Sequence, residues 1–95
     1  MENHIAEPQL SPEDNVVVAY FPNGHQRLTL VVGPLQDNGS SFLRVYVGEE
    51  LQRRYPLPNG NSIVHLDQIR SEAEMWRDEK TPPKEVITSI DSIFS

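Results

Sequence analysis

Two Pro-Asn-Gly tripeptides, at 22–24 and 58–60, each separate segments rich in apolar residues in this 95-residue chain. Asn-Gly between such segments is a strong indication of a tight turn joining antiparallel strands. At the first site a two-residue loop would pair Pro22 with His25, and proline lacks the N–H that such a pair requires. We therefore predict a three-residue loop in which Gly24 adopts the left-handed conformation.

The segments on either side of this loop, 15–21 and 25–33, are rich in β-branched and aromatic residues, which favour strands. The loop fixes their register, so that Phe21 faces His25 and Val18 faces Leu28. One face of this hairpin then carries Val16, Val18, Tyr20, Leu28, Leu30 and Val32. The other face carries Val17, Ala19, Phe21, Arg27, Thr29 and Val31.

Three further strands complete the predicted sheet. Side chains alternate strictly along 42–48, and the Gly-Glu pair at 48–49 can form a type II′ turn into a strand over 51–57. The second Pro-Asn-Gly then joins this strand to a fifth one at 61–66. The result is a five-stranded antiparallel β-meander. An alternative, in which a helix starts at Ser62 and removes the fifth strand, stays open.

Two helices are predicted after the sheet. Asp67 is a suitable N-cap for the first, and Thr81 for the second, with Pro82 at its first position. Apolar residues at helical spacing are Leu66, Ile69, Ala73 and Trp76 in the first, and Val86, Ile87, Ile90, Ile93 and Phe94 in the second. Because two helices can cover one face of the sheet, we expect a single two-layer α+β domain over 14–95, preceded by an acidic arm, 1–13.

Composition excludes several kinds of chemistry. There is no cysteine, so disulfides, iron–sulfur clusters, thiolate zinc sites and cysteine nucleophiles are ruled out. His4, His25 and His65 lie far apart, without carboxylates at metal-ligand spacing. No nucleophile elbow or phosphate-binding glycine loop occurs. We therefore expect a protein without enzymatic activity, metal or cofactor.

The net charge is −6, and the acidic residues lie mainly towards the two ends. Residues 1–14 carry four acids and no base, whereas residues 15–60 carry four arginines against three acids. The overall balance opposes binding to duplex nucleic acid, where contacts to phosphate dominate affinity. No apolar run approaches the roughly 18–20 residues of a membrane span, and the first residues lack the pattern of a secretory signal. We expect a soluble cytoplasmic protein that does not bind membranes.

The face of the sheet opposite the helices is the predicted functional surface. An exposed sheet face is normally mostly polar, yet this one keeps aliphatic and aromatic residues. With the II′ turn, Arg44 opposes Arg53, and Phe42 opposes Tyr55. The candidate partner-binding residues are Phe21, Arg27, Phe42, Arg44, Tyr46, Arg53 and Tyr55.

Three hypotheses compete for what covers this face. In the first, the acidic arm folds back, so that its carboxylates meet the arginines and its apolar side chains cover the rest. The residues concerned are Glu7, Glu13, Asp14, Ile5 and Leu10. In the second, a protein partner or a second copy of the chain binds there, because aromatic residues with arginine are typical of interface hot spots.

In the third hypothesis, single-stranded nucleic acid stacks its bases on the aromatic rings. The acidic ends and the absence of lysine before Lys80 oppose it. We favour a small, acidic, non-enzymatic protein-binding module that acts as a regulator or inhibitor of a larger macromolecular assembly. A single-stranded nucleic-acid-binding protein using the same face is the alternative, and a homodimer stays open.

Overall fold

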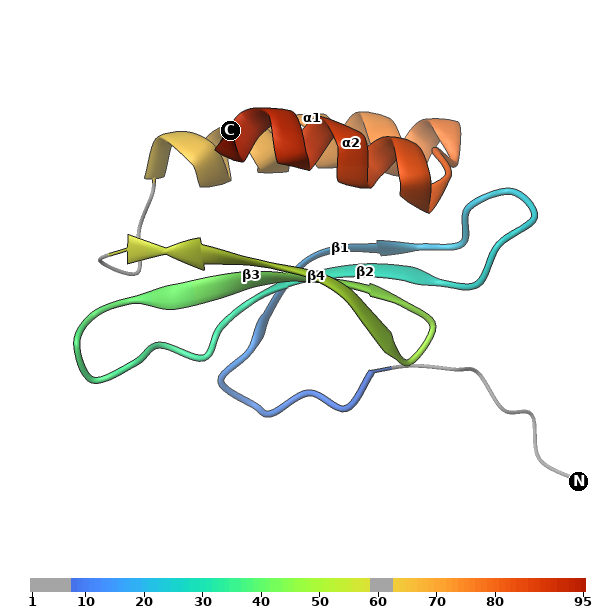
Figure 1. Ribbon diagram of the computed structural model, residues 1–95. Helices are drawn as coiled ribbons and strands as arrows, with labels where there is room; N and C mark the ends of the chain where they lie inside the picture. Colours follow the sequence, from blue (N-terminus) through green and yellow to red (C-terminus); the bar gives the residue numbers. More distant parts are fainter. Residues whose placement is uncertain (1–7, 59–62) are drawn as a thin grey trace, which may run out of the picture.

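The computed structural model describes residues 8–58 and 63–95. Its antiparallel sheet has the strand order β1-β2-β3-β4, and two helices follow it in the chain. Both helices lie on one face of the sheet (Figure 1). The elements are β1 Asn15–Tyr20, β2 Leu28–Val32, β3 Ser41–Val47, β4 Glu50–Leu57, α1 Ile63–Glu79 and α2 Pro83–Phe94. The predicted α+β architecture is confirmed, but the sheet has four strands and not five.

The predicted fifth strand is wrong because all of its described residues, 63–66, belong to α1. The helix starts at Ile63, close to the alternative start at Ser62, although residues 59–62 lie outside the described part. Leu66 is buried with Ile69, three residues later, so helical spacing and not alternation governs this segment. Asp67 consequently lies inside the helix and is not its N-cap.

The second helix begins one residue later than predicted. Its N-cap is Pro82, with Pro83 as the first helical residue, and no side chain caps it. The backbone carbonyl of Thr81 has another role, since it accepts a hydrogen bond from the Tyr20 hydroxyl at 2.8 Å. This bond ties β1 to the connection between the helices. Burial raises the pKa of Tyr20 to about 12.

The first hairpin has a wider loop than predicted. Tyr20 pairs with Leu28 and Val18 with Leu30, so the register differs by two residues from the expected one. Gly24 does adopt the predicted left-handed conformation, with φ +75°. A shift of two keeps Val18 and Tyr20 on the helix-covered face. A bulge between Val16 and Val18 leaves Val16 half-exposed, contrary to the prediction.

The second hairpin has the predicted turn but not the predicted register. Val47 pairs with Glu50, and Gly48 has φ +63°, as the first central position of a type II′ turn requires. The pairing then shifts, because Tyr46 pairs with Leu51 but Val45 pairs with Arg53. Gln52 is therefore an extra residue in β4, and every later residue of the strand changes face relative to the prediction.

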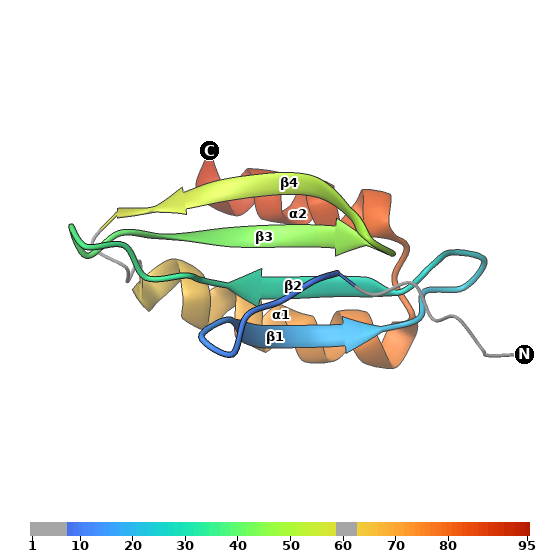
Figure 2. The same ribbon diagram turned by 90° about the horizontal axis from the view of Figure 1, so that it is seen from below.

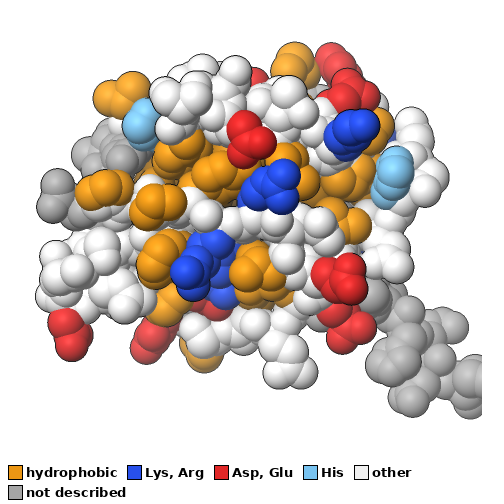
Figure 3. Space-filling model, in the orientation of Figure 1, with side chains coloured by type: hydrophobic (Ala, Val, Ile, Leu, Met, Phe, Trp, Pro, Cys, Tyr) orange, Lys and Arg blue, Asp and Glu red, His pale blue; other side chains and the backbone are white. Residues whose placement is uncertain are grey.

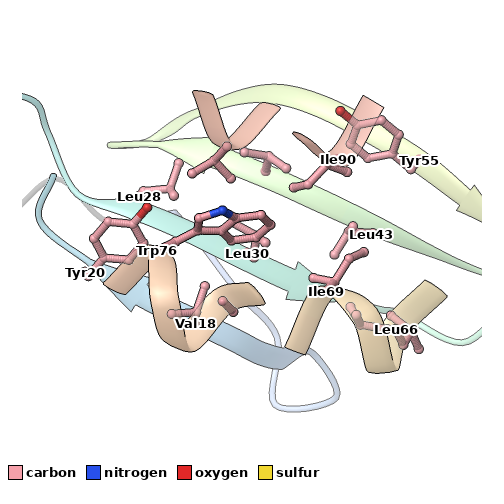
Figure 4. Close-up of a cluster of buried hydrophobic side chains, with 14 of the residues drawn as sticks. Val18, Tyr20, Leu28, Leu30, Leu43, Tyr55, Leu66, Ile69, Trp76 and Ile90 are labelled. Carbon is pink, nitrogen blue, oxygen red and sulfur yellow. The ribbon is translucent and has the colours of Figure 1, made fainter. Parts of the chain in front are cut away.

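The hydrophobic core fills the space between the sheet and the helices (Figure 4). The predicted stripe of α1 is confirmed, since Leu66, Ile69, Ala73 and Trp76 are all buried. From α2, Val86 and Ile90 are completely buried, and Ile87, Ile93 and Phe94 pack at the margin. The central strands contribute Leu28, Leu30, Leu43 and Val45, each without solvent exposure. The helices therefore leave the other face of the sheet for the chain preceding β1 and for solvent.

Candidate binding surfaces

The segment 8–14 lies against the open face of the sheet, where it crosses in front of β2 on its way to β1 (Figure 2). Its last residue, Asp14, contacts Arg44 of β3 at 2.9 Å between Oδ1 and Nη2. The two side chains are 5% and 15% exposed, so this ion pair is largely shielded from water. The arm hypothesis is confirmed for Asp14, whereas Glu7 and Ile5 lie outside the described residues.

The Asp14 carboxylate is held from two sides. The backbone N–H of Ser11 donates to Oδ2 at 3.0 Å, and Arg44 lies at Oδ1. Burial alone would raise the pKa of this carboxyl, but the Ser11 hydrogen bond and the contact and charge of Arg44 together lower the pKa below its ordinary value. Asp14 is therefore a carboxylate fixed in its charged form.

Gly33 makes room for this carboxylate. A Cβ atom at Gly33 would lie 2.8 Å from Asp14 Oδ1 and 3.3 Å from Asp14 Cα. Its φ of +142° is also unfavourable for residues with a side chain. Beneath this segment, the sheet residues Thr29 and Val31 are 2% and 0% exposed. The apolar part of the open face near β2 is thus covered within the monomer.

The outer part of the open face, on β3 and β4, carries aromatic rings under guanidinium groups. The Cζ of Arg54 lies 4.6 Å from the ring centroid of Phe42, and the Cζ of Arg44 lies 5.6 Å from that of Tyr46. Arg44 also donates from Nη1 to the Tyr46 hydroxyl at 2.7 Å. Phe42 and Tyr46 are half-buried and Arg54 is exposed. We call Phe42, Tyr46 and Arg54 the β3–β4 strip.

Arg44 and Arg54 are directly opposed across the two strands. Like charges in this position repel each other. Arg44 is compensated by Asp14, whereas Arg54 has no carboxylate within 4 Å in residues 8–58 and 63–95. The strip therefore carries one uncompensated positive charge beside two half-exposed rings.

The structure brings only part of the predicted contact set together. Phe42, Arg44 and Tyr46 lie on the open face of β3, whereas Phe21 and Arg27 lie in the loop that joins β1 to β2. Phe21 is 55% exposed. Placing Arg53 and Tyr55 on the same face was wrong, because the bulge at Gln52 turns both towards the helices.

Tyr55 is instead part of the contact between the sheet and α2. It is 8% exposed, and its ring stacks on Phe94 with centroids 4.9 Å apart. Its hydroxyl donates to the Asp91 carboxylate. Burial and the Asp91 carboxylate both raise the pKa of this phenol well above its ordinary value. Arg54 was missed because only the bulge brings it to the open face, and no residue pattern marked that bulge.

Two hollows lie along the seam between β4 and α2. One, of about 490 Å³, has basic side chains from His25, Arg53 and Lys84 around an apolar surface. The other, of about 550 Å³, is bounded by aromatic rings and prolines, including Tyr55 and Phe94. Figure 3 views the molecule from the side where β4 and α2 lie in front, and it shows basic side chains standing among apolar ones there.

Neither a metal-binding group of side chains nor a membrane-spanning helix is found in the part of the chain that the structure describes. No three His, Cys, Asp or Glu side chains there are grouped to hold a metal ion. Neither α1 nor α2 is long and apolar enough to span a membrane.

Comparison with protein-family models, with curated proteins and with solved structures finds no match to this chain. The function must therefore be inferred from the geometry of its own surfaces.

Proposed function

We propose that the protein is a small non-enzymatic binding module that docks a protein partner through the β3–β4 strip. A regulator or inhibitor of a larger assembly is the form of function that we favour. The observation that carries the proposal is Arg54, which lies over the Phe42 ring without a carboxylate partner in the described chain. Arginine and aromatic residues are enriched among the residues that dominate binding energy at protein interfaces.

The strip suits a protein partner for two physical reasons. The half-exposed rings of Phe42 and Tyr46 can lose further apolar surface to a partner, at about 25 cal/mol per Å². Arg54 can gain a carboxylate that the monomer does not supply, and its planar guanidinium is already oriented by the ring beneath it. Aromatic area with an oriented charge gives both affinity and specificity.

We favour a protein over single-stranded nucleic acid because a guanidinium group already lies over each of the two rings. Each ring of the strip has a guanidinium above it, which leaves less of its face for stacking with a base. Arg44 is also neutralised by Asp14, and the chain has a net charge of −6. Binding to nucleic acid should weaken steeply as salt is raised, whereas an aromatic contact should change far less.

The test is affinity capture with the full chain from a lysate of its natural host. Wild type is compared with Arg54→Glu and Phe42→Ala, and with Arg70→Glu as a matched charge reversal at an exposed position of α1. We expect wild type and Arg70→Glu to retain the same protein, and both strip variants to lose it. Retention by all four would show that the strip is not the contact surface.

Light scattering tests the homodimer separately. A particle of 10.8 kDa is the monomer, and a mass of about twice that value would show that the chain forms a dimer. If Arg54→Glu then restores the monomer, the partner is the chain itself.

A further inference from the structure

β4 carries basic side chains on both sides of an unpaired edge. It is the last strand of the sheet and pairs with β3 alone among the described strands. Arg54 points to the open face, where it lies over Phe42. The preceding residue, Arg53, lines the hollow of about 490 Å³ on the side of α2. A molecule lying along this edge would therefore meet positive charge on both of its sides.

The hollow has the chemistry of a site for a carboxylate attached to an apolar chain. Lys84 and His25 add two basic side chains to that of Arg53, and Val47, Pro83 and Ile87 supply apolar surface. Neither Arg53 nor Lys84 has a carboxylate within 4 Å in the described residues.

Asp91 is the single acidic residue that lines this hollow. Its carboxylate accepts the hydrogen bond of the Tyr55 hydroxyl, which comes from β4. Arg53 and Lys84 together outweigh the charge of Asp91, so the lining of the hollow is positive in a chain whose net charge is −6. Such a local reversal of sign attracts and orients an acidic ligand.

We propose that the partner presents an extended acidic segment to the outer edge of β4, with one of its carboxylate side chains in this hollow. The proposal rests on the proposed function and names the chemistry of its partner. Side chains alternate between two sides along an extended segment. Carboxylates on one side would reach Arg53 and Lys84, and those on the other side would reach Arg54.

Two features of β4 limit how much of the binding comes from backbone pairing. Gln52 is bulged, and Pro56 has no N–H to donate, so regular pairing is confined to 53–55 between them. Three residues of strand pairing are too few for a stable ladder on their own. Side-chain charges must therefore provide most of the specificity, and acidic segments are selected over basic ones.

The test uses two blocked seven-residue peptides with the full chain. In one, pairs of adjacent glutamates are separated by valine, so that its carboxylates point to both sides of the extended peptide, and in the other lysine replaces every glutamate. Two-dimensional amide NMR spectra follow the titration. We expect the glutamate peptide alone to shift the amide signals of 53–55 and of the first two turns of α2, from Lys84 to Asp91. Equal binding of the lysine peptide, or shifts confined to other elements, would overturn the proposal.

Variants then assign the contact to the hollow. Each of Arg53→Gln and Lys84→Gln should weaken glutamate-peptide binding by about two- to fivefold, as expected for an exposed ion pair. The double variant should weaken it by about tenfold. Arg70→Gln, at an exposed position of α1 away from the hollow, should leave the affinity unchanged.

Failure of this inference can be told apart from failure of the proposed function. If the captured protein is lost with Arg54→Glu but held equally well by Arg53→Gln/Lys84→Gln, the strip is the docking surface and the hollow is not occupied. If Arg54→Glu retains the protein, the strip itself is wrong. If all these variants lose it while Arg70→Glu retains it, both proposals are supported.

Discussion

Removing the charge of Asp14 should destabilise the protein by more than a typical surface substitution. The carboxylate and Arg44 are 2.9 Å apart, with side chains 5% and 15% exposed. Breaking a fully buried pair from one side costs about 3–5 kcal/mol, because the remaining charge is left uncompensated. Arg44 keeps some contact with water and its hydrogen bond to Tyr46, so we expect about 2–3 kcal/mol for Asp14→Asn.

A double-mutant cycle separates the ion pair from other effects. Arg44→Met keeps the apolar stem and removes the charge, and it should also cost about 2–3 kcal/mol. The double variant should lose no more than the larger single one, giving a coupling energy of about 2 kcal/mol between positions 14 and 44.

Urea denaturation followed by the fluorescence of Trp76 measures these energies. Trp76 is the one tryptophan of the chain and is 2% exposed, so its emission reports the loss of the core. Single effects that add within about 0.5 kcal/mol would refute the reasoning, because two independent sites behave in that way.

The pH dependence gives a second test with a defined sign. The pKa of Asp14 is lower in the folded state than its ordinary value of 3.8. The unfolded chain therefore binds more protons in the interval between the two pKa values, and stability rises with pH across that interval. Asp14 makes its full contribution to the free energy of unfolding above about pH 4–5, and this contribution disappears as the pH falls through the lowered pKa. The difference in free energy of unfolding between wild type and Asp14→Asn should narrow below about pH 4.

Three further predictions concern other parts of the fold. Gly33→Ala should cost about 2 kcal/mol more than Gly24→Ala in urea denaturation, because both glycines have positive φ but only the first lacks space for a Cβ; equal losses would contradict the close approach. Between about pH 10 and 12, stability should fall more in wild type than in Tyr20→Phe, because the raised pKa of Tyr20 stabilises the fold only while the phenol keeps its proton. Tyr55→Phe should lower the free energy of unfolding by about 1–2 kcal/mol through loss of the bond to Asp91, and an unchanged midpoint would contradict it.

The layers of the fold could be predicted from local patterns. Helical spacing from Leu66 to Trp76 and the alternation along β3 both reflect burial on one side, and the structure confirms both. The Gly48 turn was also predictable, because only glycine adopts its conformation readily. Each of these features depends on a few residues that are close in the sequence.

The register of β4 could not be predicted in the same way. A bulge adds one residue to one strand and is stabilised by packing against other elements. Here it places Tyr55 against Phe94 and its hydroxyl on Asp91, which lie 36 or more residues further along the chain. One extra residue moves every later side chain of β4 to the opposite face of the sheet. Arg54, and not Arg53, therefore lies on the open face. The residues of the open face were therefore predicted correctly on β3 and wrongly on β4.

The opposed pair of Arg44 and Arg54 links stability to the proposed binding. With Asp14 in place, the three side chains of Asp14, Arg44 and Arg54 carry a net charge of +1, and the uncompensated charge lies on Arg54. Asp14→Asn uncovers a second positive charge at the same place, so the fold loses stability while the attraction for an acidic ligand increases. The glutamate peptide should then bind Asp14→Asn about two- to fivefold more tightly than wild type at low salt, and the gain should shrink at high salt. A parallel loss of stability and affinity would instead mean that Asp14 supports the binding surface only by holding it in shape.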